Sequence, residues 1–303
     1  MYMAFVVLLE GGTSPEREIS LRSAAEVAKA LTNKGHTVRN LDTSRPLNAY
    51  KDILFKADVV FPVLHGIGGE DGTIQNYLED LRIPFVGSGS RASMLCFDKY
   101  KYTKHIAKKG LPTAKSSLVT LNDLWTNKLV KAPFVLKPFD GGSSIDTFLI
   151  RDPQLVNYEL INDVFTRHKQ MLLEQLITGN EITVGVLNSH ALPVIEIIPP
   201  VDGEFDFTNK YNGTTQELCP PIHISSKIQS EAQRLAELAH NYCDCQDISR
   251  TDMMVDTQGN LFILETNTIP GMTAQSLFPK AAKVAGIDMI DLCDQLVQQA
   301  MAR

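Results

Sequence analysis

Short apolar runs alternate with segments of helical length over the first hundred residues. Strands are predicted where the apolar runs fall, at residues 4–9, 36–41, 59–64 and 84–86. Helices are predicted at residues 14–35 and 73–81. The first helix should begin at Ser14-Pro15 and end at Gly35, because proline suits the first turn of a helix and glycine the position after its last turn. This alternation predicts a small, mostly parallel α/β sheet.

From about residue 98 the pattern becomes that of an α+β lobe. Asp98 is expected to cap a helix that runs to Lys109. Further strands are predicted at residues 134–137, 147–150 and 171–174, with a helix at 154–167. The glycine- and serine-containing loop FDGGSSID joins the first two of these strands, so they should form an antiparallel pair.

The remaining residues predict a second α+β lobe. Strands are expected at 181–187, 191–198, 249–255 and 261–265, with a helix at 228–242 and a helical segment near the end of the sequence. The polar stretch EFDFTNKYNGTTQELCPP predicts a long loop, and long loops in compact domains often carry function. We therefore expect three lobes, at residues 1–95, 96–178 and 179–303.

The hairpin SRTDMMVDTQGNLFILETN ends on charged and amide side chains, which strands disfavour. A two-residue turn at Gln258-Gly259 would place Asp252 opposite Glu265 and Arg250 opposite Asn267, with all four on one face. Two directly opposed carboxylates repel each other unless a cation lies between them. Oxygen-only ligands suit Mg²⁺ rather than zinc, so Asp252, Glu265 and Asn267 form a candidate magnesium site.

The alternative interpretation of this face is a surface cluster in which Arg250 neutralises the two acids without a metal. The metal interpretation is favoured because the other face of the hairpin is apolar. The residues expected on that apolar face are Met253, Val255, Phe262 and Leu264. Mg²⁺ held by two or three side chains completes its shell with phosphate oxygens and water, so a nucleotide is its natural companion.

The sequence lacks the standard phosphate-binding motifs. No glycine precedes a lysine and no GxGxxG follows the first strand, so neither a P-loop nor a dinucleotide fingerprint is present. FDGGSSID is a candidate phosphate loop, with backbone N–H groups, the hydroxyls of Ser143 and Ser144, and Lys137 just before it; an ordinary hairpin turn is the alternative. Lys99 is a second candidate because it lies on the apolar side of its helix, although snorkelling to solvent explains it equally well.

Two further residues lie beyond the carboxyl ends of predicted parallel strands, where open α/β sheets bind their ligands. These are Glu16 and His65. The simpler interpretations are that Glu16 complements a helix N-terminus and that His65 is a core histidine.

Composition favours work on small molecules. The net charge of -6 and the pI of about 5.7 argue against a nucleic-acid binder. The apolar start MYMAFVVLLEGG is too short for a membrane span and lacks the basic lead of a signal peptide. Five unclustered cysteines indicate reduced thiols and a cytoplasmic location.

Several of these stretches, taken in order, resemble the D-alanine:D-alanine ligases of the ATP-grasp superfamily. The matching stretches span nearly the whole sequence: LLEGGTSPEREIS, LHGIGGEDGTIQNYLE, VGSGSRASMLCFDK, KPFDGGSSI, LLEQLITGNEITV, NKYNG, SRTDMMVD and ILETNTIPGMTAQSLFPKAA. The resemblance implies a three-lobed fold with ATP gripped between the second and third lobes. It also implies a cytoplasmic homodimer that joins two D-alanines through an acyl phosphate for peptidoglycan synthesis.

The resemblance implies a role for each residue singled out above. Asp252, Glu265 and Asn267 would hold two Mg²⁺ ions, with Mn²⁺ as a substitute. The ATP contacts would be Lys99, Lys137, Ser144, Glu174, Gln175, Ile177, Glu181 and Lys210. The catalytic set would be Glu16, Ser143, Tyr211, Arg250 and Gly271, in which the first three order the loops over the site and the last two stabilise an oxyanion. The substrate contacts would be Glu16, His65, Arg250, Ser276 and Leu277.

Two positions depart from the family pattern. Asp146 stands where glycine is usual, and Gln175 stands where lysine is common. The alternatives to a D-alanine:D-alanine ligase are a D-serine or D-lactate ligase and a nucleotide-binding homologue without catalysis, the last motivated by Asp146. Tyr211 favours the dipeptide-forming enzyme, since lactate-using relatives usually carry another residue there.

Overall fold

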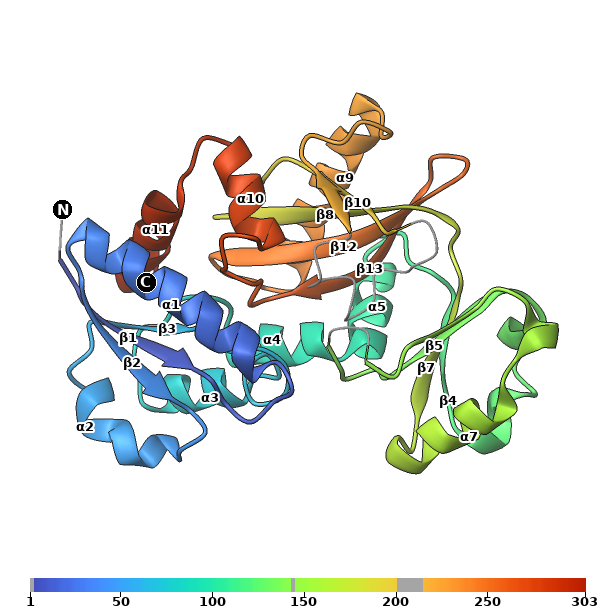
Figure 1. Ribbon diagram of the computed structural model, residues 1–303, viewed down its shortest axis with the longest axis horizontal. Helices are drawn as coiled ribbons and strands as arrows, with labels where there is room; N and C mark the ends of the chain where they lie inside the picture. Colours follow the sequence, from blue (N-terminus) through green and yellow to red (C-terminus); the bar gives the residue numbers. More distant parts are fainter. Residues whose placement is uncertain (1–2, 143–144, 201–214) are drawn as a thin grey trace.

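The computed structural model describes residues 3–142, 145–200 and 215–303, which build three sheets (Figure 1). The first sheet has the order β2-β1-β3 and is wholly parallel, as the alternation of strands and helices predicts. Its strands are β1 (Phe5–Glu10), β2 (Thr37–Asp42) and β3 (Val59–Pro62). The strand predicted at residues 84–86 is reduced to one parallel bridge between Val60 and Phe85.

Helix α1 is the long helix of this N-terminal lobe. It spans Arg17–Lys34 and has Glu16 as its N-cap, so the predicted start at Ser14-Pro15 is wrong. The Ser14 hydroxyl donates to the His65 carbonyl at 2.7 Å and accepts the Glu16 N–H at 3.3 Å, so it links the loop after β3 to the start of the helix. Gly35 ends the helix with a φ of 102°, as predicted. The other helices of this lobe are α2 (Lys51–Leu54), α3 (Thr73–Asp80) and α4 (Ser90–Phe97), preceded by the 3₁₀ turn η1 (Leu47–Tyr50).

The central lobe contains a four-stranded antiparallel sheet of order β4-β7-β5-β6. Its strands are β4 (Ser116–Val119), β5 (Phe134–Lys137), β6 (Phe148–Ile150) and β7 (Met171–Gln175). Its helices are α5 (Lys99–Lys108), α6 (Leu121–Leu124) and α7 (Tyr158–Arg167), with 3₁₀ turns η2 (Lys128–Lys131) and η3 (Pro153–Leu155). The antiparallel β5–β6 pair is confirmed. The helix predicted at 154–167 is shorter, because Asn157 accepts the Leu160 N–H and caps α7 there.

The C-terminal lobe contains a six-stranded sheet of order β11-β10-β8-β12-β13, with β9 beside β8. Its strands are β8 (Gly179–Leu187), β9 (His190–Ala191), β10 (Ile195–Ile198), β11 (Gln216–Leu218), β12 (Ile248–Asp256) and β13 (Leu261–Asn267). Its helices are α9 (Ser226–Tyr242), α10 (Leu277–Val284) and α11 (Met289–Ala302). The single strand predicted at 191–198 divides at Pro193, which cannot donate to a ladder. Strand β11 forms within the predicted long loop.

The last helix returns to the first lobe, where α11 lies beside α1 (Figure 1). Val6 and Leu8 of β1 share a hydrophobic core with Leu292 and Leu296 of α11. Helices α4 and α5 cross from the N-terminal lobe to the central lobe (Figure 1). Both helices contact β13 of the C-terminal lobe, so the three lobes adjoin there.

Candidate active site

The β12–β13 hairpin carries the candidate metal ligands in the predicted register. Arg250 pairs with Asn267, and Asp252 pairs with Glu265. Both pairs lie on one face, because Thr251 and Thr266 between them form the intervening pair. The predicted opposition of two carboxylates is confirmed.

The turn of this hairpin differs from the prediction. The Asp256 N–H donates to the Asn260 carbonyl at 2.9 Å, so three residues form the loop instead of Gln258-Gly259 alone. The register shifts between Asp252 and Met253, which leaves Leu264 as a bulge. The bulge offsets the extra turn residue, and the site end of the hairpin keeps its register.

The bulge also changes the apolar face. Met253 and Val255 are buried as predicted, but their partners are Ile263 and Leu261. Phe262 and Leu264, which we expected on that face, are only half-buried. Side chains alternate along a strand, so one inserted residue moves the residues between the bulge and the turn to the opposite face.

Each carboxylate of the opposed pair has a cation beside it. Arg250 donates to both oxygens of Asp252, from Nε at 2.9 Å and from Nη2 at 2.7 Å. Lys99 Nζ lies 2.9 Å from Glu265 Oε2. The Arg250–Asp252 ion pair of the alternative interpretation is therefore present, but it is not at the surface, because Asp252 is only 5% exposed; the Glu265 side chain is 29% exposed. Burial opposes the charge on Arg250, but the Asp252, Glu265 and Glu70 carboxylates hold its pKa above the ordinary value.

Lys99 joins the hairpin to the glycine loop of the central lobe. It is the first residue of α5, and its Nζ also donates to the Gly141 carbonyl at 2.5 Å. Its side chain is 13% exposed, so snorkelling to solvent is wrong. Lys137, at the end of β5, lies 2.6 Å from Glu174 of β7. Burial opposes the charge on Lys137, but Glu174 and other carboxylates hold its pKa above the ordinary value.

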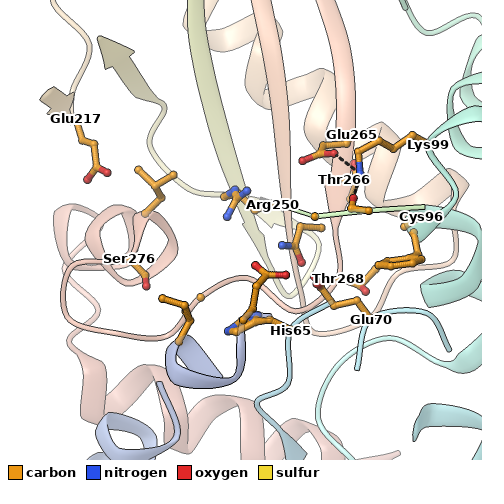
Figure 2. Close-up of a pocket in the computed structure, with 18 residues that line it drawn as sticks. His65, Glu70, Cys96, Lys99, Glu217, Arg250, Glu265, Thr266, Thr268 and Ser276 are labelled. Atoms are coloured by element: carbon orange, nitrogen blue, oxygen red, sulfur yellow. Dashed lines mark hydrogen bonds and ion pairs between the residues drawn. The ribbon is translucent and has the colours of Figure 1, made fainter. Parts of the chain in front are cut away.

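A polar cavity between the three lobes is lined by residues from all of them (Figure 2). The predicted site residues that line it are Glu16, His65, Lys99, Arg250, Glu265, Asn267, Gly271, Ser276 and Leu277. The predicted residues that do not line it are Lys137, Glu174, Gln175, Ile177, Glu181 and Asp252. The predicted residues outside the described ranges are Ser143, Ser144, Lys210 and Tyr211.

Glycines allow two loops to approach Glu16 closely. A Cβ on Gly66 would lie 3.1 Å from Glu16 Oε2, and a Cβ on Gly142 would lie 2.9 Å from the same oxygen. Gly66 also has a φ of 72°, which disfavours any side chain. His65 is buried beside Gly66, and burial lowers the pKa of its imidazole, which is therefore neutral near pH 7.

The loop between β13 and α10 closes the cavity on another side. A Cβ on Gly271 would lie 2.8 Å from Ser276 Oγ, so the loop needs glycine there. Ser276 is the N-cap of α10, its Oγ accepts the Thr273 N–H at 3.1 Å, and Leu277 is the first helical residue. The N-terminus of a helix favours an anion, so this side of the cavity suits a carboxylate.

Two acidic residues of the cavity were not predicted. Glu70 lines it, and its Oε2 accepts the Gly66 N–H at 2.6 Å. Burial, together with Glu16, raises the pKa of Glu70 to about 8. Glu70 follows the glycines just past β3, so the rule that selected His65 could also have found it. Glu217, on β11, lines the cavity and pairs with Lys280. It lies in a stretch that was predicted to be a loop, so the sequence pattern gave no reason to single it out.

Asp146 adopts a positive φ, a conformation that glycine reaches without strain. Its φ is 54°, and aspartate is one of the few residues that tolerate positive φ. Arg167 Nη2 donates to its Oδ1 at 2.9 Å, and His168 Nε2 lies 2.8 Å from its Oδ2. The Arg167 hydrogen bond lowers the pKa of Asp146, which is ionised near pH 7. The departure from glycine is therefore accommodated by an anchor to the end of α7.

A parallel α/β lobe and two antiparallel-sheet lobes that meet at one polar cavity define the ATP-grasp class of fold. Family models match two parts of the chain: the D-ala D-ala ligase C-terminus at residues 106–298 and the D-ala D-ala ligase N-terminus at residues 39–88. The chain belongs to the D-alanine–D-alanine ligase family, and the resemblance seen in the sequence is confirmed.

Individual relatives agree along nearly the whole chain. A D-alanine–D-alanine ligase of Syntrophobacter fumaroxidans is 41% identical over 98% of this chain and 97% of its own. A crystal structure of D-alanine–D-alanine ligase from Bacillus anthracis complexed with ATP superposes with a TM-score of 0.84 at 28% identity, covering 99% of this chain and 98% of that one. The VanG D-Ala:D-Ser ligase of Enterococcus faecalis has a TM-score of 0.82 at 26% identity, covering 99% of this chain and 100% of that one. Over the described residues, none of the helices combines the length and apolarity that a membrane crossing requires.

Proposed function

We propose that this chain is a D-alanine:D-alanine ligase, which joins two D-alanines with conversion of ATP to ADP and phosphate for peptidoglycan synthesis. The observation that carries the proposal is the polar cavity between the three lobes. Its lining includes the carboxylates of Glu16 and Glu265, the cations Lys99 and Arg250, and Gly271. The relatives' names and the ATP-bound structure from Bacillus anthracis support both substrates.

The first step activates a carboxylate, which is a poor electrophile. A carboxylate oxygen of the first D-alanine forms a bond to the γ-phosphorus of ATP, and the bond from that phosphorus to the β,γ-bridging oxygen breaks, releasing ADP. Lys99 and Lys137 neutralise charge on the phosphates. The remaining proposed nucleotide contacts are Ser144, Glu174, Gln175, Ile177, Glu181 and Lys210. Ser143 and Tyr211 act with Glu16 to order the loops that exclude water from the acyl phosphate.

The second step forms the peptide bond. The amine of the second D-alanine, after losing a proton, attacks the carbonyl carbon of the acyl phosphate, and inorganic phosphate leaves. Arg250 and the Gly271 N–H donate to the oxyanion of the tetrahedral intermediate, where fixed donors accelerate most. Ser276 and Leu277, at the N-terminus of α10, receive the carboxylate of the second substrate.

Asp252, Glu265 and Asn267 fit a hard divalent cation, since they offer only oxygen ligands and two of them are directly opposed carboxylates. Bound Mg²⁺, in two ions for which Mn²⁺ substitutes, supplies charge neutralisation on the transferring phosphoryl group. Arg250 and Lys99 contact these carboxylates, so a metal that bound there would share or replace those contacts. We further propose that residues 1–95, 96–178 and 179–303 form the three lobes of each chain. The protein acts as a homodimer in the cytoplasm.

The experiment is ADP release by the purified protein with Mg²⁺ and ATP in the presence of D-alanine. L-Alanine, D-serine with D-alanine, and D-lactate with D-alanine run in parallel, because a D-Ala:D-Ser ligase shares this fold. D-Alanyl-D-alanine is the expected product with D-alanine alone. If turnover occurs only when D-serine or D-lactate is added, that compound and not D-alanine is the second substrate. Binding of ATP without turnover in any mixture would refute the proposed catalysis.

A further inference from the structure

We propose that Glu70 binds the ammonium group of the first D-alanine, as a third acceptor beside Glu16 and His65. This inference rests on the proposed function and deepens it. An ammonium group has three N–H donors, and each loses a hydrogen bond to water when it enters a cavity. A site for it therefore needs three acceptor atoms, and Glu70 adds a second carboxylate to the oxygens of Glu16 and the ring nitrogen of His65.

Two of these side chains approach one glycine, and the third belongs to the residue just before it. Glu70 Oε2 accepts the N–H of Gly66 at 2.6 Å, and Glu16 Oε2 would lie 3.1 Å from a Cβ on the same residue. His65 is the residue before Gly66 in the chain. All three side chains line the same cavity, and Figure 2 shows His65 and Glu70 together on one side of it.

His65 offers an acceptor that the described part of the chain does not use. Its side chain is 6% exposed, and its Nε2 is buried without a hydrogen-bond partner among the described residues. Its imidazole is neutral, and the lone pair of an unprotonated ring nitrogen accepts one hydrogen bond. A buried acceptor without a donor is unfavourable until a ligand supplies one.

The charges around Glu70 favour a bound cation. Within the described ranges no ion pair includes Glu70, and the nearby Lys99 is engaged by Glu265 and the Gly141 carbonyl. Burial makes the largest contribution to the raised pKa of Glu70, and the charges of Glu16 and Glu265 raise it further. The Gly66 N–H and Lys99 lower it, and the resulting pKa is about 8. Arg250 lies in the same cavity and is paired with Asp252. An ammonium between Glu16 and Glu70 would favour the ionised form of Glu70, and binding near pH 7 would then release protons.

The alternative role for Glu70 is to brace the loop through the Gly66 N–H. Glu70→Gln separates the two roles, because the amide oxygen still accepts from Gly66 while the negative charge is lost. Asp71→Asn is the matched control. Asp71 is the next residue, accepts the N–H groups of Gly68 and Thr73 at 2.9 and 3.0 Å, and does not line the cavity.

The experiment measures steady-state kinetics. It also measures the binding of D-alanine by calorimetry at pH 7 with Mg²⁺ and ADP present, in two buffers of different ionisation enthalpy, because the difference in heat between the buffers reports the number of protons released. Glu70→Gln should raise the KM for the first D-alanine roughly 10- to 100-fold. The KM for ATP should stay within about twofold, and proton release should be lost. Asp71→Asn should behave as the wild type in all three measurements.

Two outcomes overturn the inference in distinguishable ways. A wild-type protein that forms the dipeptide, with a Glu70→Gln variant of unchanged first-site KM and unchanged proton release, refutes the role of Glu70 alone. A wild-type protein that neither binds nor uses D-alanine refutes the proposed function and this inference with it. The wild-type binding measurement in two buffers needs no variant, so it tests the proton release even where Glu70→Gln does not fold.

Discussion

Replacing Asp146 by glycine and by alanine separates its backbone conformation from its side-chain contacts. Both variants lose the hydrogen bonds to Arg167 and His168, so that loss cancels when the two are compared. The remaining difference is a Cβ at a φ of 54°. A left-handed residue with a Cβ costs about 1–2 kcal/mol, and the greater freedom of glycine in the unfolded chain offsets roughly 0.4–1 kcal/mol of this.

Asp146→Ala should therefore be less stable than Asp146→Gly by about 1 kcal/mol. In thermal unfolding this corresponds to a midpoint lower by roughly 2–4 °C. Asp163→Ala is the control, because Asp163 also pairs with Arg167, at 2.5 Å, but lies within α7. At this position the alanine variant should be at least as stable as the corresponding Asp163→Gly variant, because alanine has the higher helix propensity.

The activity of the two variants tests the same reasoning. Asp146 lies at the end of the glycine loop whose Gly141 carbonyl accepts from Lys99. Asp146→Gly should keep its KM for ATP close to that of the wild type, because the backbone conformation remains accessible. Equal unfolding midpoints for the alanine and glycine variants, or a higher midpoint for alanine, would refute the claim that positive φ dominates at this position.

Two further changes probe the cavity and the core. Lys99→Met should lower kcat/KM for ATP by roughly 10²- to 10³-fold, because it removes a fixed cation near the phosphates. Lys101→Met, on the exposed face of the same helix, is the control and should have a kcat/KM close to that of the wild type. Equal effects of the two changes would contradict the assignment of Lys99. Burial lowers the pKa of His240 to about 4, so the unfolded state protonates first and stability falls as pH drops from 6.5 towards 4. Between pH 7 and pH 4.5 the wild type should lose about 2 kcal/mol more than His240→Asn in denaturant titrations, and parallel pH profiles would refute this origin.

The register at the site end of the β12–β13 hairpin was predictable because strand alternation and turn position are local properties. The pairing of Asp252 with Glu265 was predicted from alternation alone. The turn itself was not, since a three-residue loop and a bulge at Leu264 combine to give the same register at that end. Which face of β13 is buried depended on that bulge, and nothing in the sequence near Leu264 marks it.

Other features depended on contacts distant in sequence. Strand β11 within the predicted loop exists because β10 pairs with it, and the short stretch Gln216–Leu218 has no strand signal of its own. Glu70 was overlooked because its position after two glycines reads as turn chemistry. Its significance follows only from Glu16, which lies 54 residues earlier and reaches the same glycine.

By itself, the sequence determined the alternation of strands and helices in the first lobe, the opposed carboxylates of the hairpin, the motifs of the ligase family and the helix end at Gly35. These features depend on periodicity, backbone preference and short spacing, which act over a few residues. Only the tertiary structure decided that Lys99 pairs with Glu265, that α11 packs on α1, and that Glu16, His65 and Glu70 adjoin one glycine. These contacts join residues far apart in the chain, and their free energy comes from burial and charge compensation that exist only once the lobes are packed together.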